Sequence, residues 1–475
     1  MLFNSYAFIF GFLPVALVGY FLLGRWREGR FANAWLVLAS LFFYGYWTPR
    51  YLPLLLTSIA VNYFLGGRIL QAQADMPRHG RRGGGGFFFL GVAFNLGLLC
   101  WFKYMDFLIG NVNRLLGADL PLLHIVLPLG ISFFSVTQMV YLIGVYFYKE
   151  GRGPRNIVDY ALFVSFFPHL LAGPILYHKP MMRQFADSRL RVPQAENMAR
   201  GLALFTVGLA KKTVIADSFI APVAAGFAGA GSLSFADGWL LALSYALQLY
   251  FDFSGYSDMA VGAARMLNLE IPVNFRAPFR ATSLSDFWSR WHMSLTATIM
   301  AYIYTPLLRL RRQVTLAWLA CVTVTTMVVI GIWHGAGWTY VVFGLVHGLG
   351  LTVNQGWKHF HLPMPRPLAR LLTLGFVIAA CVLFRADSLS QAWTVYQAMF
   401  GFHGLHWLTE GMRASMASPA ILALGLLLVG FCPESNELVK KYFRPSLLWA
   451  AGLAAAFAFS VLQFTQITAF LYFQF

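Results

Sequence analysis

The stretch Gly331-Ile-Trp-His-Gly-Ala-Gly-Trp-Thr-Tyr-Val-Val-Phe-Gly-Leu-Val-His-Gly348 places two histidines in sequence that is hydrophobic enough to enter a bilayer. A histidine in such sequence is either a hydrogen-bonding group between helices or a functional residue. His334 is flanked by a tryptophan and three small residues, which would let backbone or substrate approach its ring. In a continuous helix the 13 residues from His334 to His347 rise by roughly 20 Å. We therefore predict chemistry at His334, with His347 supporting it or lining an access tunnel.

The composition predicts a polytopic membrane protein. Of the 475 residues, 59% are hydrophobic and only 11% are charged, against about 25% charged residues in soluble proteins. The four cysteines are dispersed without Cys-x-x-Cys spacing, which speaks against a disulfide framework and against a zinc site, and we predict no metal. A net charge of +17 would indicate a nucleic-acid partner in a soluble protein. In a membrane protein, basic cytoplasmic loops that face anionic lipid explain it, and we expect no nucleic acid.

Apolar runs predict the first membrane spans. The run that ends at Gly24 lacks the basic start and the cleavage site of a signal peptide, so we expect it to remain as the first span. Further spans are expected at about 31–48, 50–69, 87–104 and 125–148. Basic loops follow at 25–30, 78–82 and 149–155. These loops fall on one side of the membrane, which the positive-inside rule assigns to the cytoplasm.

The segment Phe166-Phe-Pro-His-Leu-Leu-Ala-Gly-Pro174 introduces two prolines, a glycine and His169 into an apolar run. An uninterrupted helix tolerates this poorly, and broken backbone at membrane depth requires surrounding protein or a water-filled cavity. We predict a re-entrant element here. The arginine-rich stretch 181–200 that follows is expected at the cytoplasmic surface.

A second chemical cluster, Gln248-Leu-Tyr-Phe-Asp-Phe-Ser-Gly-Tyr-Ser-Asp258, closes a long apolar run. A carboxylate at the centre of a membrane helix costs about 2.5–3.5 kcal/mol, so Asp252 should face the protein interior or a cavity. Tyr256 lies four residues later on the same helix face, whereas Asp258 points elsewhere. A structural network between helices and a role in catalysis are equally open for this cluster.

The segment Ser283-Leu-Ser-Asp-Phe-Trp-Ser-Arg-Trp-His-Met-Ser-Leu295 predicts an interfacial helix. Ser283 and Asp286 form a capping box, and Asp286 can pair with Arg290 one turn later. His292 is either functional or a solvent-exposed member of an interfacial aromatic belt, and we favour the belt. Basic residues then follow at Arg309, Arg311 and Arg312.

In order, these motifs resemble the membrane-bound O-acyltransferase (MBOAT) family, and the resemblance covers nearly the whole chain. It is carried by Phe-Pro-His-Leu-Leu-Ala-Gly-Pro (167–174), Gln-Leu-Tyr-Phe-Asp-Phe-Ser-Gly-Tyr-Ser-Asp-Met-Ala (248–260), Phe-Trp-Ser-Arg-Trp-His-Met-Ser-Leu (287–295), Trp-His-Gly-Ala-Gly-Trp-Thr-Tyr (333–340) and Leu-Phe-Arg-Ala-Asp (383–387). Within the family, the chain most resembles the branch that serves bacterial alginate O-acetylation, and cellulose-acetylation homologues are near it. That branch usually has a Trp-Leu-Arg-Asp-Tyr segment after residue 295, which is absent here, so another exopolysaccharide stays open.

The resemblance implies a many-helix fold with a cytoplasmic funnel for an acyl donor, and it places the family's active histidine at His334. It also implies a separate periplasmic partner of the SGNH-hydrolase type that completes transfer to the polysaccharide. The residues themselves agree with acyl transfer, because a desolvated imidazole suits a general base or an acyl carrier. We expect Trp333, Gly335 and Trp338 to line the tunnel, and Arg309, Arg311 and Arg312 to hold the phosphates of acetyl-CoA. Further candidate supporting or tunnel residues are His347, Asp252, Tyr256, His292 and His169.

We therefore predict an all-α polytopic membrane protein of roughly 11–13 transmembrane or re-entrant helices, with interfacial helices and a central tunnel. Residues 1–475 should form a single integral-membrane domain, with N-terminal spans (1–156), a core with the re-entrant and catalytic motifs (157–348) and C-terminal spans (349–475). The predicted function is transfer of acetyl from cytoplasmic acetyl-CoA across a bacterial inner membrane, for O-acetylation of a polysaccharide such as alginate or cellulose. No cofactor is expected to be bound permanently, and membrane lipid surrounds the protein. A transporter or flippase without acyl-transfer chemistry, or an acyltransferase for another cell-envelope polymer, is the alternative.

Overall fold

The computed structural model describes residues 1–26, 29–75, 83–148, 156–405, 419–464 and 470–471, and these residues form helices and loops without a β-strand. Among the described residues, six helices are long and apolar enough to cross a membrane, or seven if one pair bent by 63° counts as a single span. The other helices are shorter or more polar. The predicted fold class, an all-α polytopic membrane protein, is confirmed, whereas the expected number of 11–13 transmembrane or re-entrant helices and the central tunnel stay predictions. The predicted basic loops 78–82 and 149–155 lie outside the described residues, as do residues 27–28 of the first loop.

The chain divides into two compact units. Unit 1 contains Met1–Phe205 and Met259–Pro272, and unit 2 contains Thr206–Asp258 and Val273–Phe475. Two helices, α10 (Ala195–Ala210) and α12 (Phe235–Met266), contribute residues to both units. The prediction of one integral-membrane domain stays a prediction.

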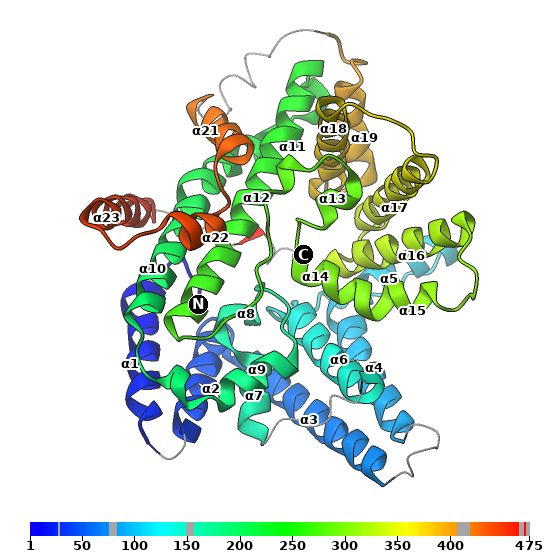
Figure 1. The fold of residues 1–475 in the computed structure, drawn as a ribbon. Helices are drawn as coiled ribbons and strands as arrows, with labels where there is room; N and C mark the ends of the chain where they lie inside the picture. Colours follow the sequence, from blue (N-terminus) through cyan, green and yellow to red (C-terminus); the bar gives the residue numbers. More distant parts are fainter. Residues whose placement is uncertain (27–28, 76–82, 149–155, 406–418, 465–469, 472–475) are drawn as a thin grey trace. The chain divides into compact units, whose positions relative to one another are not determined.

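Unit 1 begins with helices close to the expected spans. In order they are η1 (Ala7–Phe12), α1 (Leu13–Gly24), α2 (Arg30–Gly45), α3 (Leu52–Ala74), α4 (Gly85–Leu99), α5 (Met105–Leu116), α6 (Ile131–Tyr148), α7 (Ile157–Ser165), α8 (Phe167–Leu170) and α9 (His178–Ala186) (Figure 1). The break predicted at 166–174 is present, because α7 ends at Ser165 and only the single turn α8 precedes a nonhelical segment. Within the arginine-rich stretch, Arg183 and Arg189 are exposed, whereas Arg191 is buried and donates to the carbonyl oxygen of Phe185 at 2.6 Å.

Unit 2 contains the motifs that carry most of the predicted chemistry. Its further helices are η6 (Lys211–Ala216), α11 (Ile220–Ala228), α13 (Leu284–Trp288), α14 (Met293–Ile299), α15 (Thr305–Leu308), α16 (Leu316–His334), α17 (Trp338–His359), α18 (Arg366–Arg385), α19 (Leu389–Met399), α21 (Pro419–Phe431), α22 (Ser435–Glu437), η11 (Leu438–Tyr442) and α23 (Leu447–Leu462). The long helix α12 carries the aspartates of the second cluster.

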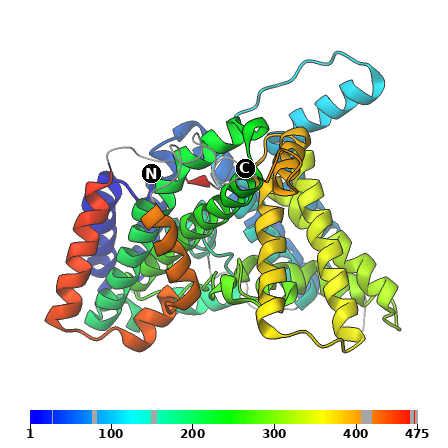
Figure 2. The ribbon, with the colours of Figure 1, turned by 90° about the horizontal axis from the view of Figure 1, so that it is seen from above.

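Helices α16 and α17 form an antiparallel hairpin and pack along most of their length (Figures 1 and 2). The chain turns at residues 335–337, because α16 ends at His334 and α17 begins at Trp338. Glycines make the close packing possible. A Cβ on Gly344 would collide with the backbone of Met327, and one on Gly348 would lie 2.8 Å from the Cα atom of Val324. Small residues at such positions let two helix backbones approach closely.

The segment 283–295 is not one interfacial helix, contrary to our prediction. Ser283 does cap α13, since its hydroxyl accepts from the backbone N–H of Asp286, and Asp286 pairs with Arg290 at 2.7 Å. The helix then stops after Trp288, and His292 adopts a left-handed φ of 44° before α14 begins. Three apolar residues of this segment, Phe287, Trp291 and Leu295, are buried rather than exposed to an interface, because this turn folds them into unit 2.

Candidate active site

His334 is the last residue of α16 and is buried, with 5% of its surface exposed. Its ring contacts aromatic rings on three sides. The centroid distances are 5.0 Å to Trp333, 5.1 Å to Phe384 of α18 and 6.4 Å to Phe343 of α17. The hairpin turn therefore presents the imidazole to an aromatic, largely water-free environment.

His347 lies in the middle of α17 and is also buried. The indole Nε1–H of Trp288 donates to its Nδ1 at 3.3 Å, which leaves Nε2 to carry the hydrogen of the neutral ring. Phe343 contacts His347 at a centroid distance of 4.5 Å and also contacts His334. The separation of roughly 20 Å predicted for a continuous helix does not apply, because the chain reverses at the glycines between the two histidines.

Both histidines line one small cavity of about 30 Å³. Its other lining residues are Ala246, Leu249, Phe279, Phe287, Trp288, Trp291, Phe343, Val377, Cys381 and Phe384. A cavity needs about 10–15 Å³ on this scale to hold one water molecule. The space beside His334 therefore accommodates a group of only a few heavy atoms.

The three residues that we expected to line a tunnel, Trp333, Gly335 and Trp338, do not line this cavity. Trp338 is 48% exposed at the start of α17. Gly335 has extended backbone, and a Cβ there would collide with the ring of Tyr340. Gly335 thus provides packing space for a tyrosine rather than a wall for a substrate. Trp333 is half-buried beside His334.

His292 is fully buried, so its predicted place in a wet aromatic belt is wrong. Its ring contacts Phe253 of α12 at 4.8 Å and Trp333 at 6.3 Å. The turn that contains it is held by Asn274, whose side-chain oxygen accepts from the hydroxyl of Ser294 at 2.6 Å. His292 thus lies close to the His334 region without lining the small cavity.

Asp252 and Tyr256 lie on α12 and are buried, but neither lines the His334 cavity. Asp252 pairs with Lys212 at 2.6 Å and accepts from the backbone N–H of Leu471 at 3.1 Å. Tyr256 packs on Phe470 at 4.3 Å. These contacts give both residues a structural role between elements that are distant in sequence.

His169 belongs to unit 1, where it forms part of the short helix α8. Its Nε2 lies 2.9 Å from the carbonyl oxygen of Phe163, and the ring is buried. This hydrogen bond bridges the break after α7. The contacts of His169 are those of a residue that stabilises broken backbone.

The arginines predicted to bind the donor, Arg309, Arg311 and Arg312, are exposed in the loop before α16. Because α16 and α17 are antiparallel, this loop lies at the end of the hairpin where α17 finishes. A wide cavity of about 510 Å³ is found there, lined among others by Trp357, Lys358 and Arg366. This cavity was not predicted from the sequence, although the basic residues Lys358 and Arg366 on either side of residue 360 are visible there.

Phe376 of α18 lies between the two cavities. It lines the wide cavity, and its ring contacts His347 at 5.3 Å. Because His347 lines the small cavity, two rings separate the basic cavity from the space beside His334. The arrangement offers a charged site for a large polar group and, behind an aromatic partition, a small apolar site with an imidazole.

Comparison with known proteins finds relatives that align along nearly the whole chain. The peptidoglycan O-acetyltransferase of Helicobacter pylori is 37% identical to this chain, over all of the chain and 98% of that relative. The probable alginate O-acetylase AlgI of Pseudomonas aeruginosa is 35% identical, over 96% of this chain and 85% of the relative. AlgI of Azotobacter vinelandii is 36% identical, over 95% and 87%.

The family model described as MBOAT, membrane-bound O-acyltransferase family, matches residues 130–391. The chain therefore belongs to the membrane-bound O-acyltransferase family. The predicted enzyme class, a membrane-bound O-acyltransferase, is confirmed. The matched residues include the α16–α17 hairpin with both histidines.

Proposed function

We propose that this enzyme takes an acetyl group from cytoplasmic acetyl-CoA and transfers it across a bacterial inner membrane, for O-acetylation of a cell-envelope polysaccharide. The observation that carries the proposal is the pair of neighbouring cavities, a wide basic one and a small one that His334 lines. Such a pair suits a donor with a large, phosphate-bearing body and a small transferable group.

His334 would act as the general base. The acceptor hydroxyl oxygen attacks the thioester carbonyl carbon, the carbon–sulfur bond breaks, and an O-acetyl ester and free coenzyme A are formed. His334 takes the hydroxyl proton and passes it to the departing sulfur. The last carbonyl groups of α16 stabilise the positive ring that exists between these two events.

The wide cavity is the proposed donor site. Lys358 and Arg366 offer charge to the phosphates of coenzyme A, and the indole of Trp357 offers a surface on which adenine can stack. Arg309, Arg311 and Arg312, at the same end of the hairpin, add positive charge at its approach. The pantetheine arm would then pass Phe376 and His347 to bring its thioester to His334.

Peptidoglycan is the acceptor polymer that the comparisons favour. The relative named as a peptidoglycan O-acetyltransferase aligns over all of this chain and 98% of itself, whereas 85% of the P. aeruginosa alginate O-acetylase is aligned. An exopolysaccharide such as alginate is the second candidate, supported by the 35–36% identity of the alginate O-acetylases. A periplasmic partner of the SGNH-hydrolase type would receive the acetyl group and deliver it to the polymer.

The proposed reaction is tested by supplying purified protein in lipid vesicles with acetyl-labelled acetyl-CoA and a polysaccharide or the periplasmic partner. Label in an ester bond of the acceptor supports the proposal. Ester-linked acetate in isolated peptidoglycan and exopolysaccharide, compared between cells with and without the gene, then identifies the polymer. Free acetate as the sole labelled product would contradict acetyl transfer.

The small cavity predicts a preference for short acyl groups. Val377 lines it from α18, so Val377→Ala should make room for one more carbon. We expect the ratio of kcat/KM for propionyl-CoA to that for acetyl-CoA to rise about tenfold, because one methylene group is worth about 1–3 kcal/mol in an apolar site. Val329→Ala, on the exposed face of α16, should leave the ratio unchanged. An unchanged ratio in Val377→Ala would remove the acyl group from this cavity.

The donor site predicts the orientation of the hairpin. In a protein whose four native cysteines are replaced, Arg312→Cys and Lys358→Cys should resist an impermeant thiol reagent added outside intact cells. Trp338→Cys, at the turn, should react, because α16 is long enough to cross the membrane. Labelling of the first two positions from outside would reverse the proposed direction of acetyl flow.

A further inference from the structure

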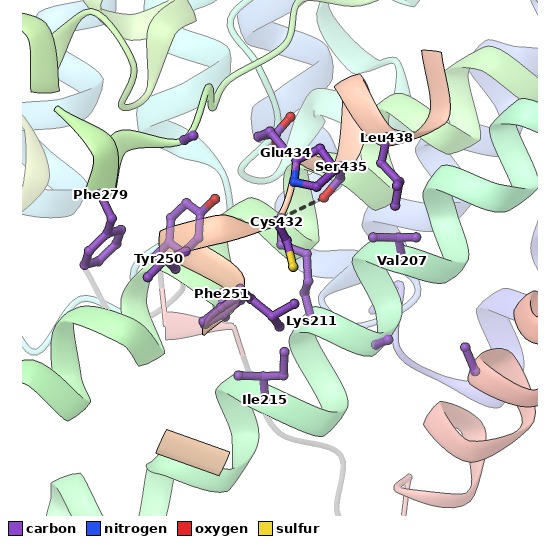
Figure 3. Close-up of a pocket in the computed structure, with 16 residues that line it drawn as sticks. Val207, Lys211, Ile215, Tyr250, Phe251, Phe279, Cys432, Glu434, Ser435 and Leu438 are labelled. Atoms are coloured by element: carbon purple, nitrogen blue, oxygen red, sulfur yellow. Dashed lines mark hydrogen bonds between the residues drawn. The ribbon is translucent and has the colours of Figure 1, made fainter. Parts of the chain in front are cut away.

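Unit 2 contains another cavity, of about 330 Å³, that has no part in the proposed acetyl transfer. Most of its wall is apolar and comes from α10, η6, α12, α21, η11 and α23 (Figure 3). The apolar lining includes Val207, Ile215, Phe251, Leu428, Leu438 and Ala456. Its volume falls in the range of about 300–1,000 Å³ that is usual for cavities that bind small molecules.

One end of this cavity is charged. Lys211 pairs with Asp258 at 2.8 Å and donates to the hydroxyl of Ser435 at 3.0 Å, and the bond to Ser435 is drawn in Figure 3. The side-chain amide of Asn436 donates to the other carboxylate oxygen of Asp258 at 3.1 Å. Both oxygens of Asp258 therefore have partners.

Glu434 differs from Asp258. It lines the cavity with only 8% of its surface exposed, and its Oε2 accepts from the backbone N–H of Asn436 at 3.0 Å. Its Oε1 is buried and has no hydrogen-bond partner among the residues that the structure describes. Two carboxylates and one ammonium group thus share this end of the cavity, and a buried charge without a partner is costly. A cationic group that donates a hydrogen bond to Oε1 of Glu434 would give this carboxylate its missing partner.

A cation is present at the rim of the same cavity. Arg280 follows two lining residues, Ala277 and Phe279, and donates through Nη2 to the carbonyl oxygen of Cys432. Its buried Nε has no partner in the described part of the chain. Cys432 lines the cavity two residues before Glu434, so the Arg280 guanidinium is held beside the segment that carries this carboxylate. This pair matches a headgroup with a positive and a negative charge.

The helices that line this cavity indicate that its ligand would come from the bilayer. Helices α21 and η11 belong to the bent pair that is apolar enough to cross a membrane, and Glu434 lies at the bend. Helix α23 is also apolar, and its Leu447 is 91% exposed. Broken backbone at membrane depth is tolerated where it lines a protein cavity, and exposed apolar helices of this kind face lipid.

We propose that this cavity binds one acyl chain of a phospholipid with a primary ammonium headgroup, phosphatidylethanolamine. The ammonium group donates to Oε1 of Glu434, the phosphate accepts from Arg280, and the chain fills the apolar part of the cavity. The bound lipid joins α21 and α23 to α12 and so stabilises this side of unit 2. The inference does not depend on the proposed reaction.

The test compares two phospholipids, only one of which has an N–H hydrogen-bond donor in its headgroup. Full-length protein is depleted of lipid in detergent, and its Tm is measured with dioleoyl phosphatidylethanolamine or dioleoyl phosphatidylcholine. Phosphatidylcholine has the same charges but no N–H group. We expect phosphatidylethanolamine to raise the Tm by about 3 °C or more above the value with phosphatidylcholine. Equal values for the two lipids in the wild-type protein would overturn the headgroup assignment.

Three variants test whether the lipid binds in this cavity. Glu434→Gln removes the charge at nearly constant shape and should abolish the difference between the lipids. Glu437→Gln is the matched control, because Glu437 lies on the same segment but is exposed and paired with Lys441. Leu428→Trp fills the cavity and should remove the phospholipid that native mass spectrometry detects on the wild-type protein. Wild-type protein without bound phospholipid, or Leu428→Trp with a full complement, would overturn the site.

Discussion

We expect acetyl transfer to fall by about 10²–10⁴-fold in a His334→Ala variant, while expression and membrane insertion stay close to wild type. The loss is large because a positioned acid–base group contributes about 10²–10⁴-fold to the rate of a reaction. No other histidine among the described residues lies at the end of α16. Insertion is little affected, since the change removes one neutral ring from an otherwise apolar helix. The measurement is the initial rate of label transfer from acetyl-CoA in vesicles that contain equal amounts of folded protein.

A control separates loss of chemistry from loss of a histidine in general. His359 lies at the exposed C-terminus of α17, outside both proposed substrate cavities. The variant His359→Ala should therefore keep the wild-type rate. A well-folded His334→Ala protein with wild-type turnover would refute the proposed general base. The family assignment would survive that result, because it depends on sequence similarity along the whole chain.

The sequence predicts the fold class here because membrane helices are defined by local properties. A run of about 20 apolar residues is visible without any tertiary information, and the first span, the break at 166–174 and the cap at Ser283 are all confirmed. The capping serine is recognisable because its partner, the N–H of Asp286, lies only three residues away.

The relation between the two histidines was not predictable in the same way. Whether His334 and His347 share a site depends on whether the glycines between them end a helix, and glycine within membrane helices is common. The donor to His347 comes from Trp288, 59 residues earlier in the chain. No periodicity connects those positions. The small cavity is thus a product of tertiary packing.

Two consecutive lysines in an apolar helix were a signal that our sequence analysis did not use. Lys211 and Lys212 are both buried, and both pair with aspartates of α12. The wider turn of the π-helix η6 helps both side chains point inward. Two lysines beside the predicted aspartate cluster would have favoured a structural network, with charges neutralised in pairs.

The packing of α16 on α17 positions His334. Substitution of Gly344, which lies where the two helices touch, tests this packing. A Cβ on Gly344 would collide with the Met327 carbonyl and lie 2.8 Å from the Cα atom of Val328. Both neighbours are backbone atoms of a helix, so they cannot yield as a flexible side chain would. We expect Gly344→Leu to give no folded protein in detergent. Gly344→Ala should lower the Tm by about 5 °C or more.

Gly344→Ala is the more informative change. Alanine is more favourable than glycine inside a helix by about 1 kcal/mol, so helix propensity alone would stabilise the variant. A lower Tm in Gly344→Ala must therefore come from the lost approach of the two backbones. Gly356 is the matched control on the same helix, since a Cβ there meets nothing within 4 Å, and Gly356→Ala should be neutral or stabilising. If Gly344→Ala behaves like Gly356→Ala, the two helices do not pack as closely as described. The cavity that brings both histidines together would then lose its structural basis.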